Sequence, residues 1–318
     1  MLALTMHHMS QASKDTAATQ AWTTRSVLAW IEGHLSDKGI DAPKVVARHL
    51  VAESIGCDVM DLFTDPDRPT TDPERAALRA MVARATAGEP LQQLLGRSGF
   101  MLRDFQVNAN VLVPRDATES LVRAVLTWVR GIDPQDRPEP LAITDIGTGS
   151  GCIAITLALE LPTAQVLAVD CSASALAVAR ANVEQHGVSD RLTCAQGDLL
   201  EPLGEHVHII VSNPPYISDE RFEALSSTVQ DHEPAMALRG GSDGLDIVRR
   251  LVAQASDRLH PGGLLAMEVD DWHVHTVAKL CTAAGLVNAR VLQDAWGDER
   301  IVLAEKVPGT FSSLHLDA

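Results

Sequence analysis

Basic side chains are in short supply in this chain. It carries 26 Lys and Arg against 42 Asp and Glu, which gives a formal net charge of −16. A surface this negative repels phosphate backbones, so the composition argues against a protein whose affinity depends on neutralising many phosphates. The deficit is uneven, because residues 1–110 hold 11 basic and 13 acidic side chains whereas residues 111–318 hold 15 and 29. A small basic cleft remains compatible with these counts.

Long hydrophobic runs and paired cysteines are also missing. No run approaches the roughly 18 apolar residues that a membrane span requires. Residues 1–20 lack the basic start and the apolar stretch of a secretory signal. The five cysteines show no Cys-x-x-Cys spacing. They predict reduced thiols in a cytoplasmic protein rather than a disulfide frame or a zinc site, and we expect no metal site and no membrane contact.

Aromatic residues make up only 3% of the chain, with five Trp, five Phe and one tyrosine, Tyr216. The hydrophobic content of 46% is ordinary for a globular protein, which excludes wholesale disorder. A length of 318 residues allows one large domain or two modest ones with ample room for a buried core.

Residues 21–97 have the pattern of a small helical domain. Hydrophobic residues recur there at helical spacing, as in Val27, Ile31 and Leu35. The run Thr-Asp-Pro-Glu at 71–74 has the composition of a capped helix start. The polar residues 1–20 and the last residues, 308–318, are expected to form flexible tails.

Between residues 98 and 114 the hydrophobic period changes from that of a helix to that of a strand. Phe105, Val107 and Val111 lie on either side of a turn-prone segment at 108–110. This pattern predicts a β-hairpin linker over 98–114. A capping box at 116–119 would then open a helix.

Residues 115–307 alternate between strand-length apolar runs and helical stretches. The alternation predicts an α/β domain with a seven-stranded, doubly wound, mostly parallel sheet whose ligands bind at the carboxyl ends of the strands. The expected strands are Leu141–Ile146, Gln165–Val169, Leu192–Gln196, Val207–Val211, Leu264–Val269, Ala289–Leu292 and Ile301–Ala304. The expected helices between them are Cys152–Leu159, Ala173–Glu184, Leu245–Leu259 and Val274–Ala283.

A glycine-rich turn follows the first of these strands. Residues 145–151 read Asp-Ile-Gly-Thr-Gly-Ser-Gly, and the three glycines let the backbone pass close beneath a ligand. Asp170 ends the next strand, where its carboxylate can accept the protons of two ribose hydroxyls. Asp198 ends the third strand, where it can either receive an adenine amino group or cap a turn. Together these features predict a nucleotide-type cofactor site.

A second site follows the fourth strand, in the segment Asn213-Pro214-Pro215-Tyr216. The two prolines remove two N–H donors and leave carbonyl acceptors, to which Asn213 adds a side-chain oxygen. Acceptors of this kind can hold an NH₂ group by both hydrogens and offset positive charge that develops on its nitrogen. Tyr216 offers a flat face to a planar group. We therefore expect catalytic roles for Asn213, Pro214 and Tyr216, and substrate contacts from these residues and Pro215.

The two segments resemble class I S-adenosylmethionine-dependent methyltransferases that modify planar NH₂ groups. More specifically, the chain resembles the protein-(glutamine-N) methyltransferases that act on peptide chain release factors, over roughly residues 45–306. The segments that carry the resemblance are Gly88-Glu89-Pro90-Leu91 with Gly96, Val111-Leu112-Val113-Pro114-Arg115 with Thr118-Glu119, the 145–151 turn, 213–217, Asp231-His232-Glu233-Pro234 with Ala237-Leu238, and 240–245.

The resemblance implies a helical N-terminal domain that recognises the release factor and a sheet with strands in the order 3-2-1-4-5-7-6. It implies methyl transfer from S-adenosylmethionine to the glutamine side chain of the Gly-Gly-Gln loop in class I release factors, without a metal. The residues expected to bind the cofactor are Gly147, Thr148, Gly149, Ser150, Gly151, Asp170, Asp198, Leu199 and Asn213. We expect a monomer, with Glu233 as a structural acceptor for the 213–216 loop.

Two segments depart from the family pattern. Asp116 and Ala117 replace the usual Pro-Glu of Pro-Arg-Pro-Glu-Thr-Glu, and residues 268–273 read Glu-Val-Asp-Asp-Trp-His where the family has Glu-x-Gly-x-x-Gln. Both changes leave the cofactor turn intact and alter loops beside the site.

Three other functions remain open from the sequence. A sibling glutamine methyltransferase of a ribosomal protein shares the core motifs. An amino-group methyltransferase of RNA or DNA would also use Asn-Pro-Pro-Tyr, but the balance of −14 over residues 111–318 and the lack of a basic, aromatic-interleaved insert argue against it. An idle S-adenosylmethionine-binding adaptor would not need Asn213 and Tyr216.

Overall fold

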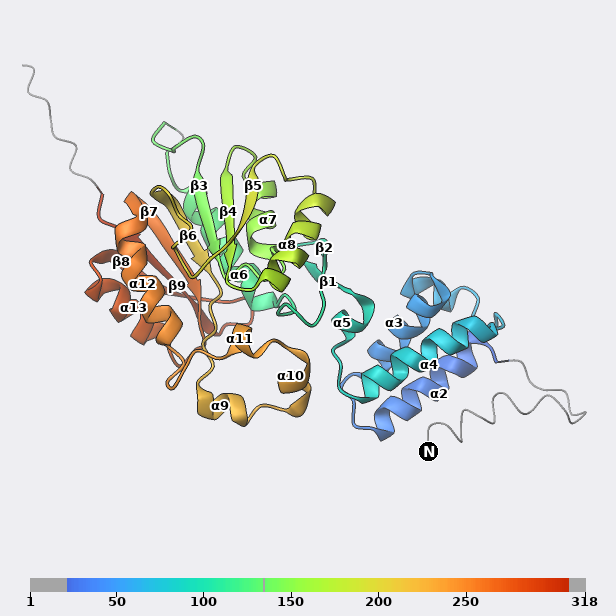
Figure 1. The fold of residues 1–318 in the computed structure, drawn as a ribbon. Coiled ribbons are helices and arrows are strands. Elements are labelled where there is room, and N and C mark those ends of the chain that lie inside the picture. The colour runs from blue at the N-terminus through green and yellow to red at the C-terminus, as the bar shows by residue number, and fades with distance from the viewer. Residues whose placement is uncertain (1–21, 134, 309–318) are drawn as a thin grey trace, which may run out of the picture. The chain divides into compact units, whose positions relative to one another are not determined.

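The computed structural model describes residues 22–133 and 135–308. They form two compact units that divide between Leu95 and Gly96 (Figure 1). The expected N-terminal tail, and all of the expected C-terminal tail except residue 308, lie outside the described residues.

The first unit is helical. Its elements are α2 (Thr24–Asp37), α3 (Pro43–Ile55), the 3₁₀ helix η1 (Val59–Phe63), α4 (Asp72–Thr86) and α5 (Leu91–Leu95). Their apolar faces meet in one core, in which Ile31, Leu35, Leu50 and Val82 are fully buried. The helical spacing of these residues in the sequence places them on the inner face of each helix.

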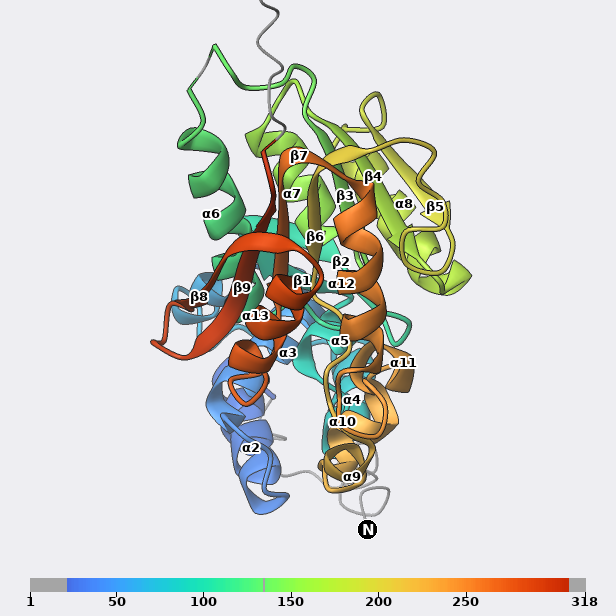
Figure 2. The same ribbon diagram turned by 90° about the vertical axis from the view of Figure 1, so that its left-hand side faces the viewer.

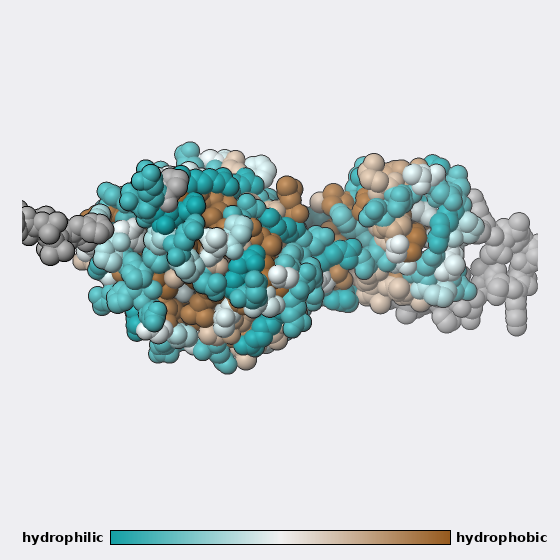
Figure 3. All heavy atoms as spheres, turned by 90° about the horizontal axis from the view of Figure 1, so that it is seen from above, coloured by the Kyte–Doolittle hydropathy of each residue, from teal (hydrophilic) through white to brown (hydrophobic). Residues whose placement is uncertain are grey.

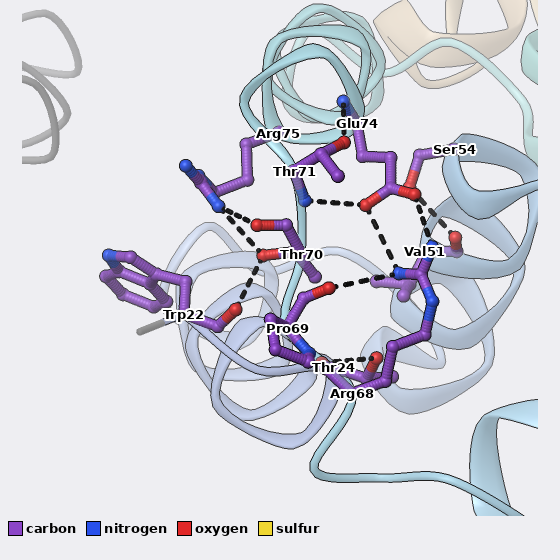
Figure 4. A network of polar contacts seen from close by, with 10 residues as sticks. All are labelled: Trp22, Thr24, Val51, Ser54, Arg68, Pro69, Thr70, Thr71, Glu74 and Arg75. Atoms are coloured by element: carbon purple, nitrogen blue, oxygen red, sulfur yellow. Dashed lines mark hydrogen bonds and ion pairs between the residues drawn. The ribbon is translucent and has the colours of Figure 1, made fainter. Parts of the chain in front are cut away.

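The start of α4 anchors the loop that precedes it (Figure 4). Thr71 and Glu74 form the expected capping box, in which the Thr71 N–H donates to the Glu74 carboxylate at 2.7 Å. Arg68 donates to the same carboxylate at 2.6 Å, and this hydrogen bond lowers the pKa of Glu74 to about 2. The Thr70 hydroxyl donates to the Trp22 carbonyl at 2.8 Å. One cap therefore ties the 68–71 loop to the residues before α2.

The second unit begins with a hairpin of β1 (Arg97–Phe100) and β2 (Arg103–Gln106). The hairpin is confirmed, but the turn expected at 108–110 is wrong as its centre, because the chain reverses at Met101 and Leu102, both with positive φ. The rings of Phe100 and Phe105 meet edge to face at 6.0 Å in the core. Burying both rings places the turn between them.

The seven-stranded sheet has the order β5-β4-β3-β6-β7-β9-β8, which is the 3-2-1-4-5-7-6 order expected. Only β9 runs antiparallel to its neighbours β7 and β8. The strands are β3 (Ala142–Ile146), β4 (Gln165–Asp170), β5 (Leu192–Gln196), β6 (Val207–Ser212), β7 (Leu259–Glu268), β8 (Leu286–Gln293) and β9 (Glu299–Lys306). The predicted α/β fold class is thus confirmed.

Helices cover both faces of this sheet (Figure 2). One face packs against α6 (Asp116–Arg130), α7 (Cys152–Glu160) and α8 (Ala173–Gln185), and the other against α12 (Asp246–Arg258) and α13 (Val274–Ala283). Three short helices, α9 (Asp219–Glu223), α10 (Ser227–His232) and α11 (Ala235–Leu238), follow β6. Burial on both faces explains why the central strands are near-continuous apolar runs.

The capping box expected at 116–119 is wrong. The helix α6 begins at Asp116 behind Arg115, whose side chain makes no capping hydrogen bond. Glu119 instead accepts the Met101 N–H at 2.7 Å and pairs with Arg123 at 2.8 Å. The hairpin turn therefore takes the carboxylate that a capping box would have used.

Hydrophilic residues cover most of the face seen in Figure 3, and hydrophobic ones show in smaller patches. The large hydrophobic residues that are exposed are Val45, Met60, Phe63, Leu102, Met236, Trp272, Trp296 and Val307. Within residues 22–133 and 135–308, no helix has the length and apolarity that crossing a membrane requires.

Candidate active site

A cavity of about 380 Å³ opens at the carboxyl ends of β3, β4 and β6. Almost all of the residues predicted from the two motifs line it: the 147–150 turn, Asp170, Asp198, Leu199 and the 213–215 segment. The fold therefore brings the two motifs, more than 60 residues apart in the chain, to one edge of the sheet. Gly151 and Tyr216 lie just behind the lining.

The glycine turn has a backbone that only glycine adopts easily. Gly147, Gly149 and Gly151 have φ values of 70°, 55° and 81°. An added Cβ at Gly147 or Gly149 would meet no described atom closer than 4.0 Å, so it would enter the space that these residues line. A Cβ at Gly151 would instead lie 3.0 Å from Ile155. The first two glycines keep the cavity open, and the third lets α7 begin.

Asp170 supports the same turn. Its two carboxylate oxygens accept the N–H groups of Gly149 and Ser172, each at 2.9 Å. A carboxylate has about four acceptor positions, so two remain for hydroxyl donors in the cavity. This residue both shapes the turn and keeps the capacity that a ribose would use.

Asp145 anchors the turn from below. It is completely buried, and its Oδ2 accepts the Thr148 hydroxyl at 2.6 Å and the Ala154 N–H at 3.2 Å. Burial raises the pKa of this carboxyl to about 7. The sequence indicated the residue only as part of the motif.

Asp198 and Leu199 lie where the third predicted strand ends, and both line the cavity. Leu199 has a φ of 52°, an uncommon value for a residue with a side chain. The Asp198 carboxylate pairs with Arg250 of α12, an ion pair about half exposed to solvent. Sequence reasoning left Arg250 on a solvated helix face and missed this pairing.

The Asn213 side chain has a defined partner. Its Nδ2 donates to the hydroxyl of Thr118 in α6 at 3.1 Å. Ser212, the residue before it, is buried and donates to the Ile146 carbonyl at 2.8 Å. With its amide nitrogen held by Thr118, Asn213 keeps Oδ1 as a free acceptor at the cavity.

The segment after α11 fixes the backbone of the 213–217 loop. Ile217 donates to the Leu238 carbonyl at 2.9 Å, and Gly240 donates back to the Ile217 carbonyl at 2.8 Å. A Cβ on Gly240 would lie 2.8 Å from the Pro215 carbonyl oxygen, and one on Gly244 would lie 2.3 Å from that of Tyr216. The glycines at 240–244 therefore allow two backbones to pack directly on each other.

Tyr216 lies beside buried acidic groups. Burial is the main cause that raises the pKa of its phenol, and the nearby Glu268 carboxylate adds to the shift. Glu268 ends β7 and is 1% exposed. Burial raises the pKa of its carboxyl to about 7, although a hydrogen bond from Thr118 and the charge of Arg300 act in the opposite direction. Sequence reasoning did not select either Thr118 or Glu268 as a partner of Asn213.

Glu233 is a buried acceptor, as expected, but its partner is not the 213–216 loop. It forms an ion pair with Arg115, which lines the cavity, while the Glu233 carboxylate is 3% exposed. The predicted partner was wrong because Arg115, far away in the sequence, reaches this carboxylate across the fold. The family segments around 115 and 233 are thus two halves of one contact.

The departure at 268–273 creates a second contact of this kind. Asp270, which stands where the family has glycine, accepts from Arg221 of α9 at 2.7 Å and lies 3.0 Å from the His273 Nδ1. Arg221 also stacks over the exposed Trp272 ring at 5.2 Å. These substituted residues fasten α9 to the loop after β7.

The paired histidines do not form a metal site. His208 accepts the Ala142 N–H at 3.0 Å and stacks on His260 with ring centroids 4.5 Å apart. Across residues 22–133 and 135–308, no group of three or more His, Cys, Asp or Glu side chains is arranged to hold a metal ion.

The residues around the cavity suit an extended nucleoside cofactor. The volume lies within the range of roughly 300–1,000 Å³ that is typical of small-molecule sites. The open side of the glycine turn, the spare acceptors of Asp170 and the Asp198–Leu199 corner provide distinct places for its tail, its ribose and its base.

Family models match both units. Residues 26–96 match the PrmC N-terminal domain, and residues 135–232 match the methyltransferase small domain. The chain is 41% identical over 288 residues to a release factor glutamine methyltransferase of Geobacter sulfurreducens, covering 90% of this chain and 98% of that protein. It is 38% identical over 301 residues to one of Rhodopirellula baltica, covering 94% and 100%.

Solved structures with low sequence identity share the fold. A methyltransferase from Pyrococcus furiosus has a TM-score of 0.50 at 16% identity, covering 71% of this chain and 97% of its own. The hMettl16 catalytic domain has a TM-score of 0.51 at 18% identity, covering 77% and 86%.

Proposed function

Since the chain belongs to the release factor glutamine methyltransferases, we propose that it methylates the side-chain amide nitrogen of the glutamine in the Gly-Gly-Gln loop of a class I peptide chain release factor. The observation that carries the proposal is the meeting of the glycine turn and the 213–215 segment at one cavity. One motif suits a nucleoside cofactor and the other suits a planar NH₂ group.

The cofactor is S-adenosylmethionine, which supplies an electrophilic methyl group when bound. In this proposal the 147–151 turn holds its amino-acid portion, and Asp170 accepts from its ribose hydroxyls. Asp198 and Leu199 border its adenine. The contact between Asp198 and Arg250 leaves one oxygen of that carboxylate for the adenine amino group.

The chain's own contribution is to position the amide and remove it from water. Asn213 Oδ1 and the carbonyl groups of the Pro-Pro segment accept the two N–H groups of the glutamine side chain. These acceptors favour the charge distribution that develops as the nitrogen reacts, and holding the reactants together lowers the entropic part of the barrier. The Tyr216 ring, placed beside this segment in the sequence, packs on the planar amide.

The helical unit is proposed to recognise the body of the release factor. Its match to the PrmC N-terminal domain over residues 26–96 supports a role tied to this family. The proposal further includes a monomeric, cytoplasmic enzyme without direct nucleic-acid binding. The balance of −14 over residues 111–318 supports the last point, because that charge repels phosphate backbones.

Mass spectrometry of purified release factor after incubation with the enzyme and S-adenosylmethionine tests the function. We expect a gain of one methyl group on the peptide that contains Gly-Gly-Gln, and no gain on a release factor whose glutamine in that loop is replaced by alanine. Ribosomal proteins and total RNA are incubated in parallel. Methylation of either one, with none on the release factor, would overturn the proposal in favour of a sibling activity.

A further inference from the structure

Glu268 is a buried carboxyl group for which the fold alone offers no reason. It is the last residue of β7, it is 1% exposed, and its Oε2 has no hydrogen-bond partner among the described residues. A buried carboxyl with an unpaired oxygen lowers the stability of a fold. Titratable groups kept under such conditions cluster at functional sites.

The register of the sheet places Glu268 beside Asn213. In the parallel pairing of β6 with β7, Ser212 lies opposite Met267. Asn213 and Glu268 are each one residue further along, at the carboxyl ends of adjacent strands. Thr118, 3% exposed in the first turn of α6, hydrogen-bonds with both side chains.

The hydroxyl between them has a direction. A threonine hydroxyl has one proton to donate and two lone pairs that accept. An ionised carboxylate can only accept, so the Thr118 proton points to Glu268, and the Thr118 oxygen is left to accept from Asn213 Nδ2 at 3.1 Å. The amide of Asn213 is then fixed with Nδ2 toward Thr118 and Oδ1 away from it.

Removing the negative charge would remove that direction. A protonated or amide side chain at 268 can donate to Thr118, and Thr118 can then donate to Asn213 Oδ1. The Asn213 amide would turn over and present its NH₂ to the NH₂ of the target, two donors facing each other.

We propose that Glu268 is a positioning residue for methyl transfer, which acts through the Thr118 hydroxyl to orient the Asn213 amide so that Oδ1 accepts from the target nitrogen. This inference rests on the proposed function, because it requires an amide NH₂ at Asn213.

The charged groups around Glu268 come from several elements. Arg300 of β9 and Arg115 before α6 lower the pKa of its carboxyl, and Asp294 before β9 raises it. Tyr216, from the loop after β6, is the remaining titratable neighbour. Since burial outweighs these effects and raises the pKa to about 7, protonation falls within the range of an activity assay.

The test compares Glu268→Gln, Thr118→Val and Thr118→Ser with the wild type, using purified release factor as substrate. We expect Glu268→Gln and Thr118→Val each to lower kcat by about 10- to 100-fold, the scale of a misplaced reacting group. The KM for the release factor and the calorimetric affinity for S-adenosylhomocysteine should stay within about twofold, because neither depends on the direction of one amide. Thr118→Ser keeps the hydroxyl and should retain wild-type kcat.

Two further measurements separate positioning from a general loss of structure. The wild-type kcat should fall as the pH drops through about 7, and Glu268→Gln should lack this acid limb. Adding Glu268→Gln to Thr118→Val should cause little further loss, because both break the same chain of hydrogen bonds. Glu305→Gln serves as the matched control, since Glu305 lies opposite Leu264, toward the other end of β7, and it should keep wild-type kcat and its acid limb.

Each outcome has a distinct meaning. A wild-type enzyme that does not methylate the release factor would overturn the proposed function itself. An active wild type together with Glu268→Gln at wild-type kcat, or with an unchanged acid limb, would overturn the role of Glu268 alone. Equal losses in kcat, cofactor affinity and thermal stability would indicate a purely structural residue and would likewise overturn it.

Discussion

The two loops that border the cavity are built in different ways. The turn after β3 is held mostly by its own backbone and by the adjacent strand: Gly147 and Thr148 donate to the Val169 carbonyl at 2.9 and 3.0 Å, and Asp170 accepts from Gly149. The 213–217 loop after β6 depends on distant partners. Its side-chain contact comes from Thr118, 95 residues earlier in the chain.

This difference indicates a division of tasks. A turn with a locally determined shape can bind a common cofactor in many proteins with one short motif. A loop whose acceptors are oriented by remote residues can be adjusted to one substrate without disturbing the cofactor turn. Lesions in the first loop should therefore impair cofactor binding, and lesions in the second should impair transfer.

Asn213→Ala should have the largest effect. It removes an acceptor that is used mainly as charge develops on the target nitrogen, so kcat should fall by about 100- to 1,000-fold or more. Affinity for S-adenosylhomocysteine, measured by calorimetry, should change little. Asn288→Ala in β8, away from the cavity, is the control. Retained turnover in the Asn213 variant would remove the proposed distinction between the loops.

Gly244→Ala should separate loop position from loop chemistry. Its Cβ would lie 2.3 Å from the Tyr216 carbonyl oxygen and push the 213–217 loop away from α6. A displacement near 1 Å can cost on the order of 100-fold in rate. Gly262→Ala is matched, because Gly262 has a similar φ of 77° and no described atom within 4 Å of an added Cβ. Equal kcat for the two variants would show that the 240–244 contact is dispensable.

Asp170→Ala should act on the other loop. Losing charge-assisted hydrogen bonds should weaken binding of S-adenosylhomocysteine by about 1.5–3 kcal/mol in calorimetry. The kcat at saturating cofactor should fall far less than in the Asn213 variant. Asp190→Ala, an exposed carboxylate that pairs only with the neighbouring Arg191 in the described structure, is the control. Unchanged affinity would contradict the ribose assignment.

Asp145→Asn should have the smallest effect on activity, since asparagine can still accept from Thr148 and Ala154. Its consequence is for stability against pH. Burial raises the folded-state pKa from its ordinary value of 3.8 to about 7. The folded state thus holds a proton that the unfolded state releases, so this group contributes stability that is lost as the pH rises between those values. Thermal unfolding from pH 4 to pH 7 should show a shallower decline in the variant; an identical decline would argue against a protonated Asp145.

The predictability of the site follows the same division. The strands and helices of the sheet domain were foreseen within a few residues, because burial on both faces leaves long apolar runs and the glycine turn marks where β3 ends. The capping box at 116–119 and the partner of Glu233 were mispredicted. In both cases a polar side chain with a plausible local partner is instead used by a distant one, Met101 for Glu119 and Arg115 for Glu233.

By itself, the sequence determined the α/β fold, the strand order implied by its family motifs, and the two motifs that line the cavity. These features depend on hydrophobic periodicity and on local backbone conformation, both of which are written in neighbouring residues. Only the tertiary structure decided that Thr118 lies between Asn213 and Glu268, that Arg115 neutralises Glu233, and that the 240–244 glycines pack on the 215–216 carbonyls. Polar contacts of this kind depend on distances of a few ångströms between segments that have no fixed relation until the sheet has assembled.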